Sequence, residues 1–448
     1  MEEDMNDLQT LEFIEECNKL GSKPGLLSIT ELTRQLGNPQ DSLKFIHIAG
    51  TNGKGSTLSF LSTTLTKAGY KVGRYLSPVI FEYRERFQIN GKMISKKDLN
   101  IYMERIKEAC EKMTAQGYAH PTSFEIETAL SFLYFKEKNC DVVVLETGMG
   151  GLLDATNIIT TTIISVITSI SMDHMQFLGQ SLKEIAGQKA GIIKENTDVI
   201  TVSQDDTVMQ VLRQVSKEKK AELIVADKKD ISHIHYGIYK QSFTYQKVSY
   251  EISLSGMYQI ENAYLSLRVL QRIREKHLLG ITSSNEKLTD AVIGKGLFET
   301  QWKGRFTIIG KKPFFVVDGA HNEAASLQLT KSVDFYFTNK RKIYIMGMFR
   351  DKECEKVVQN TVTEADQVIT VTTPFNNRAL PGYDLARIVK EYNPNVTVAD
   401  SLEEAVEMSY LFADKDSVII AFGSLSYLGA LMTIVENHKI IRSDTHGK

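Results

Sequence analysis

The sequence predicts an α/β protein built around two separate, mostly parallel sheets. Segments such as "DVVVLETG" and "SVIIAFGS" are almost entirely apolar, which is typical of strands that helices cover on both faces. Helical segments alternate with such strands in both halves of the chain. At 448 residues the chain is also longer than one hydrophobic core usually supports, so we expect two domains.

The first half begins with a helical segment that ends near "GNPQ" and leads into the short apolar strand "FIHIAG". The loop "GTNGKGS" follows, and "STLSFLSTTLTKAG" then has helical apolar spacing, with Gly69 as its stop signal. "KVGRYLSP" supplies the next strand. This strand–loop–helix–strand unit is the context in which a glycine-rich loop binds phosphate.

Further along, "DVVVLETG", "TTIISVITSISMDH" and "DVITVSQ" are predicted to be buried parallel strands. Between residues 222 and 257 the pattern alternates and is rich in aromatic residues, which predicts antiparallel hairpins on the rim of the sheet. "QIENAYLSLRVLQRIREKH" has the spacing of an amphipathic helix. The first domain is therefore expected to be a P-loop-type, mostly parallel sheet with helices on both faces and a β-hairpin rim.

A second series of strands begins after Trp302 and alternates with helical segments such as "DLARIVKEY" and "LEEAVEMSYL". Its strands are "FFVVDGAHN", "KIYIMGMF", "QVITVTT", "NVTVAD" and "SVIIAFGS". These predict a smaller, C-terminal Rossmann-like α/β domain. We place the boundary in "LFETQWKGR", which gives domains over residues 1–299 and 300–448.

Composition and charge exclude several classes of partner. The net charge of −2 and the lack of a basic tract argue against nucleic acid. No apolar run reaches the length of a membrane span, and the acidic N-terminus has no signal core. The four cysteines are scattered without a C-x-x-C pair, which favours free thiols in a reducing compartment. We expect a cytoplasmic protein.

The loop "HIAGTNGKGST" fails both standard nucleotide-binding patterns. Ile48 stands where the Walker pattern needs glycine, Gly55 follows Lys54 where that pattern needs Ser or Thr, and Ser56 comes one place late. The loop could be a simple turn that needs glycine for positive φ. Three glycines and a lysine at the start of a helix favour an anion cradle instead, with Lys54 on phosphate oxygens and Ser56 offering its hydroxyl to Mg²⁺.

Other polar residues follow predicted strands, and the carboxyl ends of parallel strands share one crevice. Glu146 could be a solvated strand end or a Mg²⁺ ligand, while a lone histidine such as His174 is more often a capping or core residue. Lys189, in "IAGQKAGIIK", could extend to solvent or enter a phosphate site, and the residues alone leave these alternatives even. The second half adds strand-end loops that suggest a cleft for a second substrate, with Asp318, His321, Asn322 and Ser424.

The motifs together resemble folylpolyglutamate synthases, within the Mur ligase superfamily, over about residues 45 to 429. The matching motifs, in order, are "GTNGKGS", "YLSP…ERFQING", "SFEIETALSF", "LETGMGGLLDATN", "SMDHMQFLG…IAGQKAGIIK", "YQIEN", "WKGR", "DGAHN" and "FGSLSYLG". The resemblance implies an ATP-dependent amide ligase. ATP phosphorylates a folate carboxylate, and the amino group of L-glutamate attacks the acyl phosphate to give folylpolyglutamates.

The resemblance also implies roles for single residues. Lys54 matches the phosphate-binding lysine, and Lys189 matches a lysine that family members carry as a carbamate. Two Mg²⁺ positions are implied, with ligands Ser56, Ser77, Glu146 and His174. The residues to which it attributes chemistry are Lys54, Lys189, His174 and Arg305.

The remaining implied contacts are to nucleotide, glutamate and folate. The nucleotide contacts are Gly50, Thr51, Asn52, Gly53, Gly55, Asn262 on the adenine side, Arg305 and Asp318. Arg86, His321 and Ser424 match positions associated with the incoming glutamate, and a guanidinium such as that of Arg86 fits a carboxylate bidentately. The partners expected are therefore small molecules, namely ATP, L-glutamate and a reduced folate, and we expect a monomer.

Three positions depart from the pattern of many members. Val79 stands where many have His after the second strand, Leu152 where many have Arg, and Glu323 where many have Pro. The first two lie in loops associated with the pterin-bearing substrate. Whether the chain also joins glutamate to dihydropteroate therefore stays open, and the retained Asp154 of "DATN" keeps that activity possible.

Three alternatives remain. A Mur-type ligase acting on another acceptor is disfavoured because the glycine loop begins at residue 50, which leaves no room before it for a domain that holds a UDP group. A dinucleotide-dependent oxidoreductase would need G-x-G-x-x-G on a first strand, which neither series provides. A nucleotide-binding protein without catalysis is disfavoured because Lys54, Glu146, His174 and Lys189 occur together.

Overall fold

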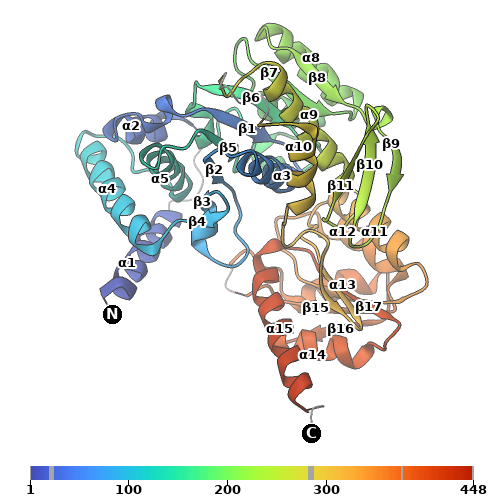
Figure 1. The fold of residues 1–448 in the computed structure, drawn as a ribbon. Helices are drawn as coiled ribbons and strands as arrows, with labels where there is room; N and C mark the ends of the chain where they lie inside the picture. The colour runs from blue at the N-terminus through green and yellow to red at the C-terminus, as the bar shows by residue number, and fades with distance from the viewer. Residues whose placement is uncertain (1, 20–24, 281–286, 375–376, 446–448) are drawn as a thin grey trace. The chain divides into compact units, whose positions relative to one another are not determined.

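The computed structural model describes residues 2–19, 25–280, 287–374 and 377–445. The chain forms two compact units. The first comprises residues 1–232, 244–250 and 261–300, and the second comprises residues 233–243, 251–260 and 301–448 (Figure 1). The second unit thus takes two segments from the region of residues 222–257, which the predicted division had assigned to the first domain.

The first unit is built on an eight-stranded sheet with the order β4-β3-β2-β5-β1-β6-β7-β8. The strands from β2 to β8 in this order pair in parallel, whereas β3 and β4 are antiparallel at one edge. Their bounds are β1 Phe45–Ala49, β2 Val72–Tyr75, β3 Phe87–Ile89, β4 Lys92–Met93, β5 Val142–Glu146, β6 Thr162–Ile167, β7 Asp198–Val202 and β8 Leu223–Ala226. The predicted parallel P-loop-type sheet is confirmed.

Helices cover both faces of this sheet (Figure 1). The helix α3, Lys54–Lys67, packs on β1, β2 and β5, and α10, Asp290–Glu299, packs on α3. On the opposite face, α4 and α5 build one apolar cluster with Phe45 and Leu145, and α7 and α8 build another with Ala49. The other helices of this unit are α1 Glu2–Asn18, α2 Leu27–Gln35, α4 Lys96–Ala115, α5 Ser123–Glu137, α6 Met175–Leu178, α7 Leu182–Ala190, α8 Asp206–Glu218 and α9 Gln259–Glu275.

Local sequence signals account for where several helices start. Thr122 and Glu125 form a capping box before α5, because the Thr122 side chain accepts from the Glu125 N–H and the Glu125 carboxylate accepts from the Thr122 N–H. Ser181 and Glu184 do the same for α7. The helices α4 and α5 were not among the predicted elements, although the capping box in "TSFE" was a usable signal for α5.

The aromatic region after β8 forms its own antiparallel sheet, with the order β11-β10-β9. These strands are β9 Ser232–His235, β10 Gln241–Tyr245 and β11 Val248–Ile252. The expected hairpins are present, as a separate sheet. The start of the predicted region at residue 222 was wrong, because Leu223–Ala226 is the parallel edge strand β8.

The second unit has a six-stranded sheet with the order β12-β13-β17-β14-β15-β16. All its pairs are parallel except β12 with β13. The strands are β12 Thr307–Lys311, β13 Phe314–Val317, β14 Arg341–Met346, β15 Gln367–Val371, β16 Val396–Ala399 and β17 Ser417–Phe422. The helices are α11 Glu323–Phe337, α12 Cys354–Thr361, α13 Gly382–Lys390, α14 Leu402–Phe412 and α15 Leu428–Thr445. The predicted C-terminal α/β domain is confirmed, and β12 is an added edge strand.

Across the described ranges, no helix is both long and apolar enough to cross a membrane.

A pair of glycines in α10 allows the packing of the first unit to be tested. A Cβ at Gly296 would lie 2.5 Å from the Thr64 Cα and 2.4 Å from its Oγ1, so Gly296→Ala must push α10 away from α3. We expect a loss of about 1–3 kcal/mol in the free energy of unfolding, measured by urea denaturation.

The matched control is Gly294→Ala in the same helix, where the nearest atom to a Cβ is Tyr250 Cδ1 at 3.8 Å. Alanine there gains helix propensity without a clash, so stability should rise by up to about 1 kcal/mol. Equal effects of both substitutions would contradict the close α3–α10 contact.

Candidate active site

The glycine loop, residues 50–56, connects β1 to α3 and leaves no room for side chains at two positions. Gly50 has φ +149°, and a Cβ there would lie 1.8 Å from Thr168 Oγ1. Gly53 has φ +91°, and its Cβ would lie 2.5 Å from Asn262 Oδ1. Glycine is therefore required for both the backbone angle and the close approach, and Asn262 of α9 is placed directly against the loop.

The segment after β6 holds this loop in position. The amides of Thr51 and Asn52 donate to the Ser169 carbonyl at 2.8 and 3.3 Å. The Thr51 hydroxyl donates to the Ser171 carbonyl at 3.1 Å and accepts from the Ser171 amide at 3.1 Å. A loop fixed in this way is preorganised, so an anion that binds it need not order it first.

Two lysines converge on one carbonyl oxygen of the loop. Lys54 Nζ donates to the carbonyls of Gly50, at 3.2 Å, and Thr51, at 3.3 Å. Lys189, at 4% exposure on α7, donates its Nζ to the same Gly50 carbonyl at 2.8 Å. Of the two alternatives for Lys189, extension to solvent is excluded, because its amine is buried beside the loop.

The expected metal ligands come from the carboxyl ends of neighbouring strands. Glu146, at 4% exposure, ends β5 and pairs in register with Ile48 of β1. Ser77 follows β2, whose last residue Tyr75 pairs with Leu145. Ser56 is 3% exposed in the first turn of α3. The topology thus brings these three residues to the same end of the sheet.

His174 follows β6 at this same end and stands at the N-cap position of α6 in a left-handed conformation, with φ 51°. Its backbone N–H donates to Asp173 Oδ1 at 2.9 Å, and its Nε2 lies 3.9 Å from that oxygen. The carboxylate of Asp173 therefore orients the histidine backbone and lies near its ring.

The Glu146 carboxylate and the Ser56 and Ser77 hydroxyls are oxygen donors of the kind that Mg²⁺ prefers, whereas the His174 imidazole is more typical of a transition-metal site. Among the residues that the structure describes, no three His, Cys, Asp or Glu side chains gather closely enough to hold a metal ion alone. One carboxylate with hydroxyls is what Mg²⁺ uses when nucleotide phosphates and water complete its shell. These residues could hold Mg²⁺ together with a bound nucleotide.

The Arg86 guanidinium forms a largely buried ion pair within the first unit. Its Nη1 lies 3.3 Å from Glu127 Oε2 of α5, with the side chains 18% and 5% exposed. Burial is the largest influence on the pKa of Arg86 and lowers it, but Glu127, Tyr75, Tyr83 and Glu146 together outweigh burial, so that pKa lies above its ordinary value. Burial raises the pKa of Glu127. The Arg86 charge is thus matched by an internal carboxylate that the sequence analysis did not identify.

The Asp154 carboxylate accepts several hydrogen bonds from its own loop. It accepts from the amides of Met149, at 2.8 Å, and Thr156, at 3.0 Å, and from the Thr156 hydroxyl at 2.5 Å. That hydroxyl lies 2.9 Å from His47 Nε2 of β1. Burial lowers the pKa of His47 to about 3, so its ring is neutral at neutral pH. The contacts of Asp154 shape the "DATN" loop and tie it to β1.

The second unit holds the other predicted residues at the carboxyl end of β13. Asp318, 3% exposed, accepts from the Tyr258 hydroxyl at 2.6 Å and from the amides of Phe306, at 2.7 Å, and Ala320, at 2.8 Å. Burial raises the pKa of Asp318, and the Arg305 guanidinium is the strongest opposing influence. Asp318 therefore holds the loop that contains Phe306 next to the end of β13, and its charge interacts with that of Arg305.

His321 and Ser424 lie in loops that start helices of this unit. His321 Nδ1 is 2.8 Å from the Gly319 carbonyl, which makes the N–H of that nitrogen the donor. Ser424 caps a short 3-10 helix, Leu425–Tyr427, and its hydroxyl is 2.9 Å from that of Ser426. Both side chains come from loops at the carboxyl ends of adjacent strands, β13 and β17.

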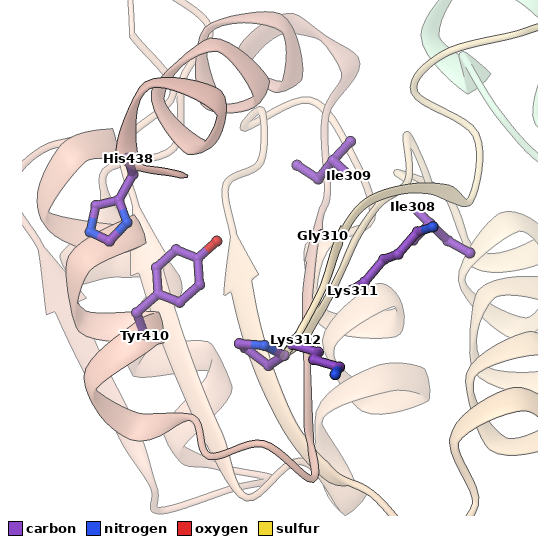
Figure 2. Close-up of a pocket in the computed structure, with 8 residues that line it drawn as sticks. Ile308, Ile309, Gly310, Lys311, Lys312, Tyr410 and His438 are labelled. Carbon is purple, nitrogen blue, oxygen red and sulfur yellow. The ribbon is translucent and has the colours of Figure 1, made fainter. Parts of the chain in front are cut away.

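A cavity of about 490 Å³ in the second unit lies apart from these loops. Figure 2 shows Tyr410 and His438 side by side across from the β12–β13 turn, which belongs to the amino end of β13. Their rings stack at 4.8 Å between centroids. Lys311 points away from them, with its Nζ 5.4 Å from the ring centroid of Tyr239. None of the residues that line this cavity is a predicted site residue.

Comparisons with known proteins identify two family domains in the chain. Residues 48–270 match the Mur ligase middle domain, and residues 304–425 match the glutamate ligase domain of Mur ligases.

Two curated relatives align over nearly their full length. The chain is 31% identical to the dihydrofolate synthase/folylpolyglutamate synthase of Bacillus subtilis, over 92% of this chain and 94% of that protein. It is 30% identical to the folylpolyglutamate synthase of Lacticaseibacillus casei, over 95% and 98%.

The solved structure of Mycobacterium tuberculosis folylpolyglutamate synthase, complexed with ADP and AMPPCP, is similar with a TM-score of 0.85 and 27% identity, over 96% of this chain and 98% of that one. With two Mur ligase domains in this chain, and identities of 30% or more over nearly the full length of both curated relatives, the chain belongs to the folylpolyglutamate synthase/dihydrofolate synthase family of the Mur ligase superfamily.

Proposed function

We propose that the chain uses ATP to join L-glutamate to the γ-carboxylate of a reduced folate, through an acyl phosphate, and so forms folylpolyglutamates. Family membership makes it an ATP-dependent ligase. The observation that carries the proposal is the preorganised glycine loop, on which the amines of Lys54 and Lys189 converge at one carbonyl. In a ligase that activates a carboxylate with ATP, positive charge must stand where the phosphoryl group leaves one oxygen and joins another, and Lys54 is assigned to supply it.

In the first unit we assign the nucleotide and the folate. The amides of residues 50–56 and the N-terminus of α3 attract the phosphates, and Lys54 pairs with their oxygens. Asn262, fixed beside Gly53, is assigned to the adenine side. Mg²⁺, when bound through Ser56, Ser77, Glu146 and His174, supplies positive charge against the charge on the transferred phosphoryl group.

In the second unit we assign the incoming amino acid and part of the nucleotide. Arg305, whose charge interacts with that of Asp318, is assigned to phosphate, and His321 and Ser424 are assigned to glutamate. Arg86 of the first unit is assigned to a substrate carboxylate. These roles give residues 1–299 the ATP and folate site and residues 300–448 the glutamate-ligase function.

A second activity is the joining of glutamate to dihydropteroate. The Bacillus subtilis relative is named for both activities. In this chain Asp154 organises the loop that carries Leu152, which is 45% exposed. An apolar side chain there, in place of the arginine of many members, favours the folylpolyglutamate reaction.

The acceptor can be tested directly. The protein is incubated with ATP, Mg²⁺, L-glutamate and either tetrahydrofolate monoglutamate or dihydropteroate, and the products are weighed by mass spectrometry. We expect the mass of the folate to rise by one or more glutamyl residues. If only dihydropteroate gained glutamate, the chain would be a dihydrofolate synthase instead. If neither acceptor gained glutamate, the proposed reaction would be refuted.

Lys54→Ala tests the phosphate loop. Loss of the cation at the loop should lower kcat/KM by about 10²-fold or more with either acceptor, measured by phosphate release. Lys67→Ala is the matched control, because Lys67 ends the same helix and its ion pair is with the exposed Glu299. Its kcat/KM should change less than about twofold. Wild-type activity in Lys54→Ala would contradict the loop assignment.

Lys189→Arg tests whether Lys189 works as a carbamate. The neutral Nζ would attack CO₂, form an N–C bond and release one proton to solvent, which leaves an anion beside the loop. Arginine keeps a donor near the Gly50 carbonyl but cannot form this group. We expect a carbamate signal in ¹³C NMR of wild type under ¹³CO₂ that is absent in Lys189→Arg, with activity reduced about 10²-fold or more.

The matched control for this experiment is Lys194→Arg, since Lys194 is the next lysine along the chain and donates to the Asn157 carbonyl. It should keep the NMR signal. An active Lys189→Arg variant, or no carbamate signal in wild type, would contradict the carbamate.

A further inference from the structure

Arg74 is a buried cation in the middle of the eight-stranded sheet that the function proposed above does not use. It lies on β2 and is only 8% exposed. Its Nη2 donates to the Ser59 hydroxyl at 2.9 Å, and Ser59 is fully buried in the second turn of α3. The guanidinium therefore lies between the sheet and the helix whose N-terminus forms the phosphate loop.

The register of the sheet places Glu146 on this same face. Arg74 pairs with Val144 of β5, and side chains alternate along a strand, so Val144 and Glu146 share the face of Arg74. That face is the one covered by α3, because Arg74 reaches Ser59. Arg74 and Glu146 are thus a buried cation and a buried carboxylate under the same helix.

The charges of these two groups interact. Burial lowers the pKa of Arg74 to about 10, and Glu146 is the strongest influence against that decrease, followed by Glu85. Arg74 therefore keeps its proton at neutral pH. A permanent positive charge in a low-dielectric interior acts on other charges over several ångströms with little screening.

We propose that Arg74 is an electrostatic positioning residue: it attracts nucleotide phosphate to the loop above it and weakens cation binding at Glu146 while no nucleotide is bound. This inference rests on the proposed nucleotide and metal sites. It predicts an order of binding, in which the metal ion is held weakly by the free enzyme and is acquired with the nucleotide, whose phosphates outweigh the Arg74 charge.

A purely structural role for Arg74 makes a different prediction. If the arginine only anchors α3 to the sheet, its removal loosens the loop and Glu146 together, and affinity for both ligands falls. If its charge matters, removal shifts the two affinities in opposite directions. A parallel fall of both affinities would therefore indicate a structural role, and opposite shifts an electrostatic role, without any measurement of turnover.

The experiment compares wild type with Arg74→Met and Arg74→Gln, which remove the charge, and with Arg74→Lys, which keeps it. Mn²⁺ binding to the nucleotide-free protein is measured by electron paramagnetic resonance, and ADP binding in EDTA by calorimetry. In both neutral variants we expect the Kd for Mn²⁺ to fall, and the Kd for ADP to rise, by about threefold or more. Arg74→Lys should stay within about twofold of wild type for both.

Ser59→Ala is the matched control, because it removes the hydrogen bond to Arg74 and leaves the charge. Both of its affinities should stay within about twofold of wild type. If the neutral variants bound both Mn²⁺ and ADP more weakly, or if neither Kd changed, the proposal would be overturned. Failure of both neutral variants to fold while Arg74→Lys folds would also overturn it, since the charge would then serve stability.

The proposed function fails by a separate result. If wild-type protein binds ADP neither in EDTA nor with Mg²⁺, the nucleotide site itself is wrong, whatever the variants do. If wild type binds ADP and the opposite shifts are missing, only the role of Arg74 is wrong.

Discussion

The close approach of the glycine loop to the segment after β6 is the constraint on which the site in the first unit depends. Gly50 meets Thr168 so closely that no Cβ fits, and the amides of Thr51 and Asn52 are tied to the Ser169 carbonyl. These contacts fix where the carbonyl of Gly50 points. Lys54, at the start of α3, and Lys189, from the distant helix α7, can then both donate a hydrogen bond to that oxygen.

The buried charges of each unit are held by hydrogen bonds or opposite charges, as burial of an ion requires. Asp154 and Asp318 accept backbone amides and hydroxyls, and in both the pKa is raised by burial. Arg86 is matched by Glu127. Such groups position loops and neighbouring side chains, so the residues that contact substrate are fewer than the polar residues that shape the site.

The sequence predicted both α/β sheets and the strand that precedes the glycine loop, because apolar strands and glycine stops are local signals. It could not predict partners that come from distant segments. Glu127 stands in a helix that was not identified, and Arg74 is one charge in an otherwise unremarkable strand. The separate sheet of β9 to β11 was missed for the same reason, since alternation indicates strands but not the sheet they join.

The late hydroxyl of the loop has a geometric explanation. The helix α3 begins at Lys54, whose side chain turns back to the carbonyls of Gly50 and Thr51. Successive helical residues are rotated by about 100°, so a hydroxyl two places later points roughly away from that lysine. Ser56 is three residues before Ser59, which faces Arg74 and the sheet, and residues at this spacing share a face. Because Gly55 intervenes, the hydroxyl stands at position 56, roughly opposite Lys54 and on the side of Glu146, where a metal ion between phosphate and carboxylate would need it.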